Sequence, residues 1–292
     1  MKRYNVYPLL SYTLFLSSFF VPIAGFIASL FAGHFLVEYS KHKNNKIIFI
    51  YITIFLITFL IFYLYHIVYI LAIIYPSILF IKYKHSYETK IVIYKNEINP
   101  VSLAFIPLLI FTLIMLYIFN FDSKLFEQLK VAMERINDYI THNNMYNKLI
   151  FDDTSIKQII NLMPAFSSVY AILITYITIK LYAKSEKVEY YFKVPDYYMP
   201  VFIVTGFLII LHNEILKLVG INSLIIFGIL FLLQGMDIIN YGINKFLKKK
   251  PFIKTLIYVI IISQLPCLIF LTIIGIFDNW FNFMKYIDIK KI

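Results

Sequence analysis

The chain has little charge and a single cysteine. Only 15% of its 292 residues are charged and 61% are hydrophobic, whereas a soluble domain carries about 25% charged residues. The one cysteine, Cys267, excludes an intrachain disulfide and a multi-cysteine metal cluster. With 8 glycines and 10 prolines the chain is neither collagen-like nor low-complexity. A soluble domain of this composition would lack polar surface, so we expect an integral membrane protein.

Sequence motifs of several enzyme and nucleic-acid-binding classes are also missing. The chain has no Walker phosphate loop, no H-E-x-x-H, no G-x-S-x-G and no glycine-rich dinucleotide turn, and no histidine pair has metal-ligand spacing. The net charge of +11 is not accompanied by a zinc-finger, RRM or helix-turn-helix pattern. We therefore expect no enzyme, no catalytic residue, no metal, no cofactor and no nucleic-acid partner. A membrane enzyme would need two ionisable groups brought together in space, which a sequence does not exclude.

Long uncharged runs separated by short lysine-rich loops predict the membrane spans. About 20 apolar helical residues cross about 30 Å of hydrocarbon, and the lysines of short loops stay in the cytoplasm. Candidate spans lie at residues 7–37 (one or two), 47–81 (two), 99–120, 155–183, 198–218, 223–244 and 255–277. The pattern predicts an all-α fold, a polytopic transmembrane helical bundle of about eight or nine spans, with the N terminus inside and the C terminus outside.

Prolines and capping residues refine these boundaries. Pro22 and Gly25 should split or kink the first run, and Pro164 should kink the helix that starts at the capping box Ser155-Ile156-Lys157-Gln158. We treat residues 1–292 as one integral membrane domain. It comprises N-terminal spans at 1–120, an extracytoplasmic segment at 121–158 and C-terminal spans at 159–292.

The segment 121–158 is the longest polar stretch. Apolar residues recur there at helical spacing, at Leu125, Leu129, Ala132, Ile136 and Ile140, which predicts one amphipathic helix. Six acidic and five basic residues give the segment no cytoplasmic bias, so we place it outside. A lid packed on the core and a helix lying flat on the bilayer both remain open.

An ordered series of motifs in the C-terminal half carries a family resemblance. It comprises Pro164, Pro200, Asn222, the run Phe231-Leu232-Leu233-Gln234-Gly235 and the run Gly275-Ile276-Phe277-Asp278-Asn279-Trp280-Phe281-Asn282-Phe283. In these motifs the chain resembles the YybS-like family of bacterial multi-pass membrane proteins, domain of unknown function 2232. The resemblance covers most of the chain and is strongest from about 159 to 286. The family motif usually continues to an arginine, where this chain has Met284 and Lys285.

The resemblance implies a location and a class of partner. The location is the bacterial cytoplasmic (inner) membrane, with the lipid bilayer around the chain. The family is distantly similar to the S components of energy-coupling-factor vitamin transporters. Those proteins capture a small molecule and act beside a transmembrane coupling protein and an ATPase. Because fold does not fix function, the site has to be argued from its residues.

Three polar residues recur every three positions in one apolar run, at Gln234, Asp237 and Asn240. They share roughly one side of a helix, and a carboxylate at bilayer depth costs about 2.5–3.5 kcal/mol. One interpretation is a polar pocket or ion relay. The other is that Asp237 lies near the cytoplasmic interface, two turns from Lys245, and pairs there, while Gln234 bonds a neighbouring helix.

A second polar group surrounds a turn predicted at Gly220, and consists of His212, Asn213, Glu214, Lys217 and Asn222. It would suit outward-facing solute capture, and an ordinary solvated loop explains it too. For solute or ion contact we predict Asn222, Gln234 and Asp237 first and Glu214 second.

Small residues and aromatic residues mark two further surfaces. Ala24, Ala28 and Ala32 recur every four residues beside a parallel row of Gly25, Ser29 and Gly33, and such rows let helices pack closely. The S components dock their partner through a similar face, so docking and internal packing are the two interpretations. Asp278, Trp280 and Asn282 end the last run, where we expect them to anchor the chain at the membrane interface.

Together these features predict a substrate-binding or permease-type subunit for a small solute, driven by an ion gradient or a separate ATPase. The alternative is a non-transporting membrane scaffold or regulatory protein that recruits partners through helix packing. A polar, water-accessible cavity that reaches Gln234 and Asp237 would favour transport. A tightly packed interior would favour the scaffold.

Overall fold

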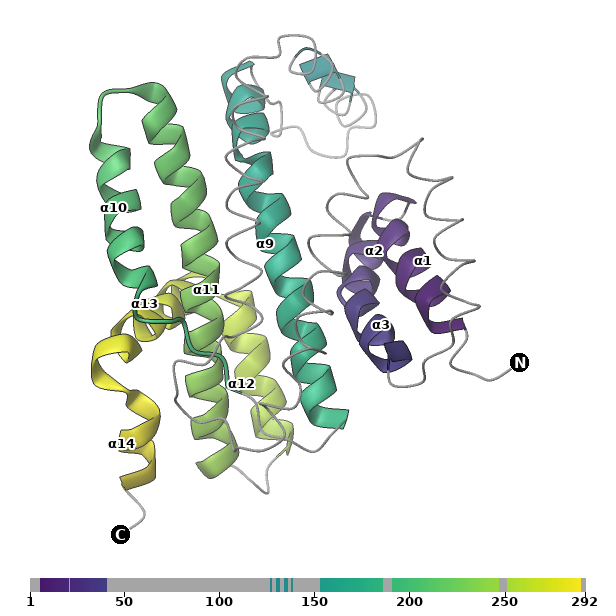
Figure 1. Cartoon of the computed structure of the whole chain (residues 1–292), viewed down its shortest axis with the longest axis vertical. Coiled ribbons are helices and arrows are strands. Elements are labelled where there is room, and N and C mark those ends of the chain that lie inside the picture. The colour runs from purple at the N-terminus through teal and green to yellow at the C-terminus, as the bar shows by residue number, and fades with distance from the viewer. Residues whose placement is uncertain are drawn as a thin grey trace. The chain divides into compact units, whose positions relative to one another are not determined.

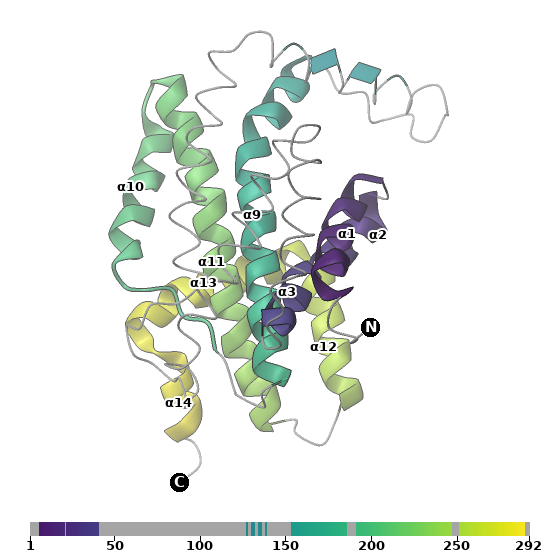
Figure 2. The same cartoon turned by 45° about the vertical axis from the view of Figure 1, so that its right-hand side comes forward.

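The computed structural model describes residues 6–20, 22–40, 127, 130–131, 134–135, 138, 153–185, 191–246 and 251–289. Within these residues every regular element is a helix (Figure 1, Figure 2), as the sequence predicts. The candidate spans at 47–81 and 99–120 lie outside the described residues. The chain divides into two compact units, residues 1–106, 170–199 and 227–292 in one and residues 107–169 and 200–226 in the other.

The helices differ greatly in length. They are α1 (Tyr7–Phe20), α2 (Pro22–Ser29), α3 (Ala32–Ser40), α9 (Asp153–Ser185), α10 (Tyr198–Ile210), α11 (Glu214–Phe246), α12 (Pro251–Ser263), α13 (Leu265–Phe281) and α14 (Phe283–Ile289). In the described part, two helical stretches are long and apolar enough to cross a membrane, Lys157–Leu181 of α9 and all of α11. The helices α12 and α13 would add a third only if they form one bent span.

The first apolar run is broken twice. Pro22 begins α2, because proline lacks the backbone N–H that a continuing helix needs and is tolerated at a helix start. A second break follows at residues 30–31, between α2 and α3. The predicted break at Pro22 is therefore confirmed. The predicted helix from 155 to 183 is also found, with Pro164 inside α9 and each end extended by two residues.

The turn predicted at Gly220 is wrong, and so are the boundaries of the two spans around it. The chain turns at residues 211–213, and Gly220 lies inside α11. Asn213 starts α11 because its Oδ1 accepts hydrogen bonds from the N–H groups of Ile215 (3.0 Å) and Leu216 (3.1 Å). Gly220 has a packing role, since an added Cβ would lie 3.0 Å from the carbonyl oxygen of Thr205 on α10.

The span predicted at 255–277 is not one continuous helix. The chain bends by 96° between α12 and α13. Gln264 precedes α13 in an extended conformation, and Pro266 occupies the first turn of the new helix. A proline favours a helix start at this position and cannot donate to the preceding turn.

The predicted amphipathic helix is described at six positions only. Residues 127, 130, 131, 134, 135 and 138 are helical, and Lys130 lies 3.8 Å from Glu134, one turn later. The apolar positions on which the prediction rests lie outside the described residues. The location of the segment relative to the membrane stays a prediction.

Glycines bring α11 and α13 into backbone contact. A Cβ added to Gly235 would overlap the carbonyl group of Leu271, and one added to Gly275 would overlap the carbonyl group of Phe231. Small residues of this kind drive close helix packing in membranes. The contact sets α13 beside Gln234 of α11, which bonds Asp278.

Candidate functional site

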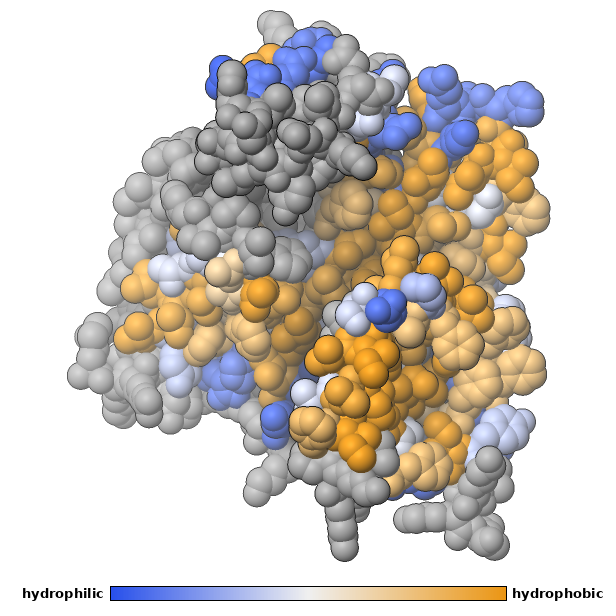
Figure 3. Space-filling view, turned by 180° about the vertical axis from the view of Figure 1, so that it is seen from behind, coloured by the Kyte–Doolittle hydropathy of each residue, from blue (hydrophilic) through white to orange (hydrophobic). Residues whose placement is uncertain are grey.

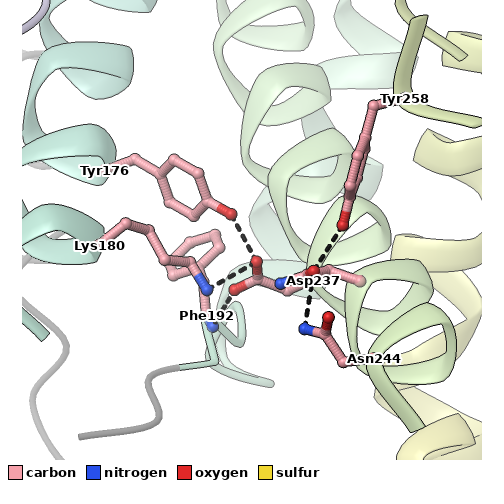
Figure 4. A network of polar contacts seen from close by, with 7 residues as sticks. Tyr176, Lys180, Phe192, Asp237, Asn244 and Tyr258 are labelled. Atoms are coloured by element: carbon pink, nitrogen blue, oxygen red, sulfur yellow. Dashed lines mark hydrogen bonds and ion pairs between the residues drawn. The ribbon is translucent and has the colours of Figure 1, made fainter. Parts of the chain in front are cut away.

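Asp237 is the centre of a buried ion pair on α11. Its side chain is 1% exposed, and its Oδ1 lies 2.8 Å from Nζ of Lys180 on α9. The hydroxyl of Tyr176 donates to the same oxygen (2.5 Å), and the N–H of Phe192 donates to Oδ2 (2.6 Å). Figure 4 shows these groups converging on the carboxylate from three directions. We call Tyr176, Lys180 and Asp237 the charged junction.

The lysine of the charged junction has a mixed environment. Its side chain is 24% exposed, and Nζ lies 5.4 Å from the ring centres of both Tyr176 and Tyr191. Aromatic faces stabilise a cation at such distances. Asp237 therefore has a partner, as the alternative interpretation requires, but the partner is Lys180. Lys245 instead donates to the carbonyl oxygen of Ile287 (2.6 Å).

The charged junction marks the end of two uncharged stretches. Residues 158–179 of α9 and 218–236 of α11 carry no charge. At about 1.5 Å per residue these stretches measure about 33 Å and about 28 Å, close to the thickness of the hydrocarbon core. Lys180 and Asp237 follow directly after these stretches, as expected for charges at the edge of a hydrocarbon core.

An extended segment before α10 is held by the same face of α11. The N–H of Phe192 bonds Asp237, and the N–H of Val194 donates to Oε1 of Gln234 (2.9 Å). The side chains of Phe192 and Val194 are buried. Non-helical backbone at membrane depth needs such partners, because lipid supplies none. The spacing of Gln234 and Asp237, one helical turn, matches two alternate N–H groups of the segment.

Gln234 also bonds the end of α13. Its Nε2 donates to Oδ2 of Asp278 (2.8 Å) and, at 3.4 Å, to Oδ1 of Asn279. Oδ1 of Asp278 accepts the N–H of Phe283 (2.7 Å), the first residue of α14. Asn282 connects the two helices in the left-handed conformation, with φ 49°. We call Gln234, Asp278, Asn279 and Asn282 the amide junction.

Two buried atoms of the amide junction make no hydrogen bond within the described part of the chain. They are Nδ2 of Asn279, a donor, and Oδ1 of Asn282, an acceptor. Buried polar groups in native proteins are nearly always bonded, so each exception needs a reason. The amide junction therefore keeps hydrogen-bonding capacity that packing does not use.

Asn240 continues the polar face toward the end of α11. Its Oδ1 accepts from the hydroxyl of Tyr258 on α12 (2.5 Å) and from Nδ2 of Asn244 (3.0 Å). Lys254 donates to Oδ1 of Asn244 (2.9 Å). These contacts fix α12 alongside α11 and extend the polar network beyond Asp237 (Figure 4).

Asn222 lies in a different cluster, against the proline of α9. Its Nδ2 donates to the carbonyl oxygens of Asn161 and Leu218 (3.0 Å each), and its Oδ1 accepts the N–H of Ala165 (3.1 Å). In an unbroken helix the Asn161 carbonyl and the Ala165 N–H would bond each other. Here the amide of Asn222 inserts between them, next to Pro164. Asn222 therefore completes the backbone hydrogen bonding of a helix that contains proline.

The other predicted residues are scattered. Glu214 is exposed at the start of α11. Trp280 is 60% exposed, whereas Asp278 is buried. Asn282 is partly buried in the connection to α14. The structure thus brings together Gln234, Asp237 and Asp278, whereas Glu214 and Asn222 belong to the other compact unit.

The three alanines do not share one uninterrupted helix. Ala24 is exposed and Ala28 half-buried on α2, whereas Ala32 is buried at the start of α3. The neighbouring row packs inward: Ser29 bonds Tyr170, and a Cβ on Gly33 would overlap the side chain of Thr178. Internal packing accounts for that row and for Ala32.

Sequence reasoning missed Tyr176, Lys180 and Asn279 as members of these junctions. In the sequence Lys180 resembles the lysines of the loops, although it lies within α9. A charge placed directly at the end of a 22-residue uncharged stretch is the signal that could have identified it.

One protein family matches almost the whole chain. Its description is "Predicted membrane protein (DUF2232)", and the match covers residues 9–279. No curated protein and no solved structure matches the chain, and the implied similarity to energy-coupling-factor S components stays a prediction. The matched region contains the charged junction, Gln234, Asp278 and Asn279. The chain therefore belongs to the DUF2232 family of predicted membrane proteins, which the YybS-like label also describes.

Proposed function

We propose that this protein is a multi-pass subunit of the bacterial cytoplasmic membrane that binds or passes a small polar solute and is not itself an enzyme. Membership of a family of predicted membrane proteins supports the membrane location. Two helical stretches of sufficient length and apolarity support the multi-pass topology, with the lysine-rich loops in the cytoplasm. Energy comes from an ion gradient or from a separate coupling protein and ATPase.

The unused hydrogen-bonding capacity of the amide junction carries the proposal. Nδ2 of Asn279 and Oδ1 of Asn282 offer one donor and one acceptor beside Gln234. A small polar molecule with both functions would satisfy them, as a few well-placed polar groups do in an otherwise apolar site. Of the solute contacts predicted from the sequence, Gln234 is the one that lies beside these two unbonded atoms.

The remaining predicted contacts take other roles in the proposal. Asp237 is saturated by Lys180, Tyr176 and a backbone N–H, and the amide of Asn222 is saturated by α9 and α11. We assign Asp237 to holding the extended segment at Phe192 beside the solute site. Opening the charged junction would release that segment, which makes Lys180–Asp237 the bond whose breaking accompanies solute exchange.

The test is untargeted mass spectrometry of small molecules that copurify with the detergent-solubilised protein. Asn279→Ala should lower the amount of the retained compound at least tenfold at unchanged protein yield, because the side chain makes one long hydrogen bond to the described part of the chain. Asn244→Ala is the matched control, since its amide belongs to the Asn240 network. Equal retention by wild type and Asn279→Ala would remove the amide junction from the site.

One observation favours the alternative function, a membrane scaffold. Gln234, Asp237 and Asn222 are fully buried, so in this conformation water does not reach the residues expected to bind solute. A scaffold would recruit its partner through α2, where Ala24 is exposed and Ala28 half-buried. Ala28→Leu should then lose a copurifying membrane partner while the yield of folded protein stays constant. Loss of folded protein to the same extent would indicate internal packing.

A further inference from the structure

The path of the C-terminal segment can be followed by its contacts along α11. The first part, α12, runs antiparallel to α11. Lys254 bonds Asn244, and four residues later Tyr258 bonds Asn240. Figure 1 shows α12 beside the C-terminal half of α11. The chain therefore starts near the lysine-rich end of α11 and moves toward its middle.

The second part, α13, does not continue along α11. Leu271 contacts Gly235, Gly275 contacts Phe231, and Asp278 bonds Gln234. The eight residues 271–278 of α13 thus stay within about one turn of α11, as expected for a helix bent by 96° away from α12. The helix crosses α11 at one level and does not run along it.

The third part, α14, runs back to the C-terminal end of α11. The carbonyl oxygen of Ile287 accepts from Lys245, and the Ile287 side chain lies 3.8 Å from where a Cβ on Gly242 would be. None of these contacts lies on the N-terminal side of Phe231. The part of α11 that precedes Phe231 is about 25 Å long, most of the thickness of a hydrocarbon core.

The outward face of α13 is apolar. Leu271, Gly275 and Asp278 are buried against α11, and the opposite stripe is exposed and consists of Ile269, Ile273, Phe277 and Trp280. Apolar side chains form most of the described surface in Figure 3. Such a stripe in water would be costly, so it needs an apolar cover.

We infer that residues 251–289 form a re-entrant element that enters and leaves the membrane on the lysine-rich side, with the exposed stripe of α13 covered by acyl chains of that leaflet. The crossing at Phe231–Gly235 lies just inside the end of the uncharged stretch of α11. Trp280 would sit at headgroup depth, where tryptophan is enriched. Lys245, Lys254 and Lys285 lie near the entry and exit and complement anionic headgroups.

This topology differs from the sequence-based one. The last predicted span does not cross, so the number of spans is one lower and the end of α14 lies on the same side of the membrane as the end of α11 at Phe246. The inference is independent of the proposed solute, because it rests only on the route of the chain.

Cysteine labelling tests the route. In a Cys267→Ser background, single cysteines replace Phe246 at the end of α11 and Tyr286 on α14, both of which are exposed. His212→Cys, exposed before the other end of α11, is the control for the opposite side. Intact cells are treated with a membrane-impermeant maleimide before and after permeabilisation. Positions 246 and 286 should react in the same one of these two conditions, before or after permeabilisation. Position 212 should differ from them. Labelling of 286 together with 212 would overturn the inference.

The single tryptophan tests the cover. Trp280 is the only tryptophan of the chain, so its fluorescence reports on α13 alone. The protein is reconstituted in vesicles of phosphatidylethanolamine and phosphatidylglycerol with phosphatidylcholine brominated either near the headgroup or near the chain end. We expect at least twofold quenching by the first lipid and clearly less by the second. Weak quenching by both, with disulfide cross-linking between copies of Ile273→Cys in the Cys267→Ser background, would show that a second copy covers the stripe.

Discussion

Helix α11 carries two buried polar clusters that differ in charge. Among the described residues, Asn222 bonds only backbone groups, two on α9 and one on α11 itself. Asp237 bonds a lysine, a tyrosine and a backbone N–H. Both side chains are almost completely buried. Asn222 is a neutral group that completes the hydrogen bonding of a helix, whereas Asp237 is a charge balanced by a lysine. The loss of stability on removing one partner should therefore differ between the two clusters.

The difference lies in what remains after a partner is lost. Without Lys180, the Asp237 carboxylate would stay buried with no opposite charge in contact. Without Asp237, Lys180 could turn toward water, because a quarter of its side chain is already exposed. Removing one partner of a buried ion pair costs about 3–5 kcal/mol, mostly because of the uncompensated charge. The two halves of the charged junction are therefore unequal.

The largest expected effect follows from this inequality. Lys180→Met should destabilise the protein by about 3 kcal/mol or more. Asp237→Asn should cost about 1–2 kcal/mol, since an asparagine still accepts one hydrogen bond. Thermal unfolding in detergent, followed by circular dichroism, measures both changes. The double variant should be more stable than Lys180→Met alone.

Lys193→Gln controls for the loss of a lysine charge. Lys193 pairs at 3.9 Å with the exposed Asp196, and such surface pairs contribute about 0–1 kcal/mol. An unfolding temperature of Lys180→Met equal to that of Lys193→Gln would show that the carboxylate of Asp237 is not held by Lys180.

A smaller effect is expected at the contact between α11 and α13. Gly235→Ala places a methyl group against the backbone of Leu271, and overpacking of this kind costs about 1–3 kcal/mol. Gly228→Ala, on the same helix, is the matched control because no atom lies within 4 Å of the new Cβ. The control should stabilise the helix by up to about 1 kcal/mol. Equal unfolding temperatures for the two variants would argue against the close crossing and against the re-entrant path.

The sequence predicts those features that depend on local chemistry. Uncharged runs and capping residues locate α9 to within two residues at each end, and Pro22 marks a real break. The three-residue spacing predicts that Gln234 and Asp237 share a face, and both do bond the segment before α10.

Features that depend on tertiary contacts are not predicted by the sequence. Lys180 becomes the partner of Asp237 only because α9 and α11 pack together. The bend at Gln264 interrupts an apolar run without a charge, so hydropathy does not reveal it. Gly220 resembles a turn residue, but its helix starts earlier because Asn213 supplies the cap.

The neutral cluster around Asn222 gives the sharpest test of mechanism, although the expected difference between two backgrounds is only about 1 kcal/mol. Asn222→Ala leaves the Ala165 N–H and the Asn161 carbonyl without the bonds that Asn222 supplies, at a cost of about 1–3 kcal/mol. If the amide completes a helix that proline interrupts, replacing the proline should restore the ladder. We therefore expect Asn222→Ala to cost at least 1 kcal/mol less in a Pro164→Ala background, by the same unfolding measurement. Additive effects would mean that Asn222 stabilises the contact between α9 and α11 independently of Pro164. The charged junction offers no such rescue by a backbone change, since its unbalanced group is an ion and not a peptide dipole.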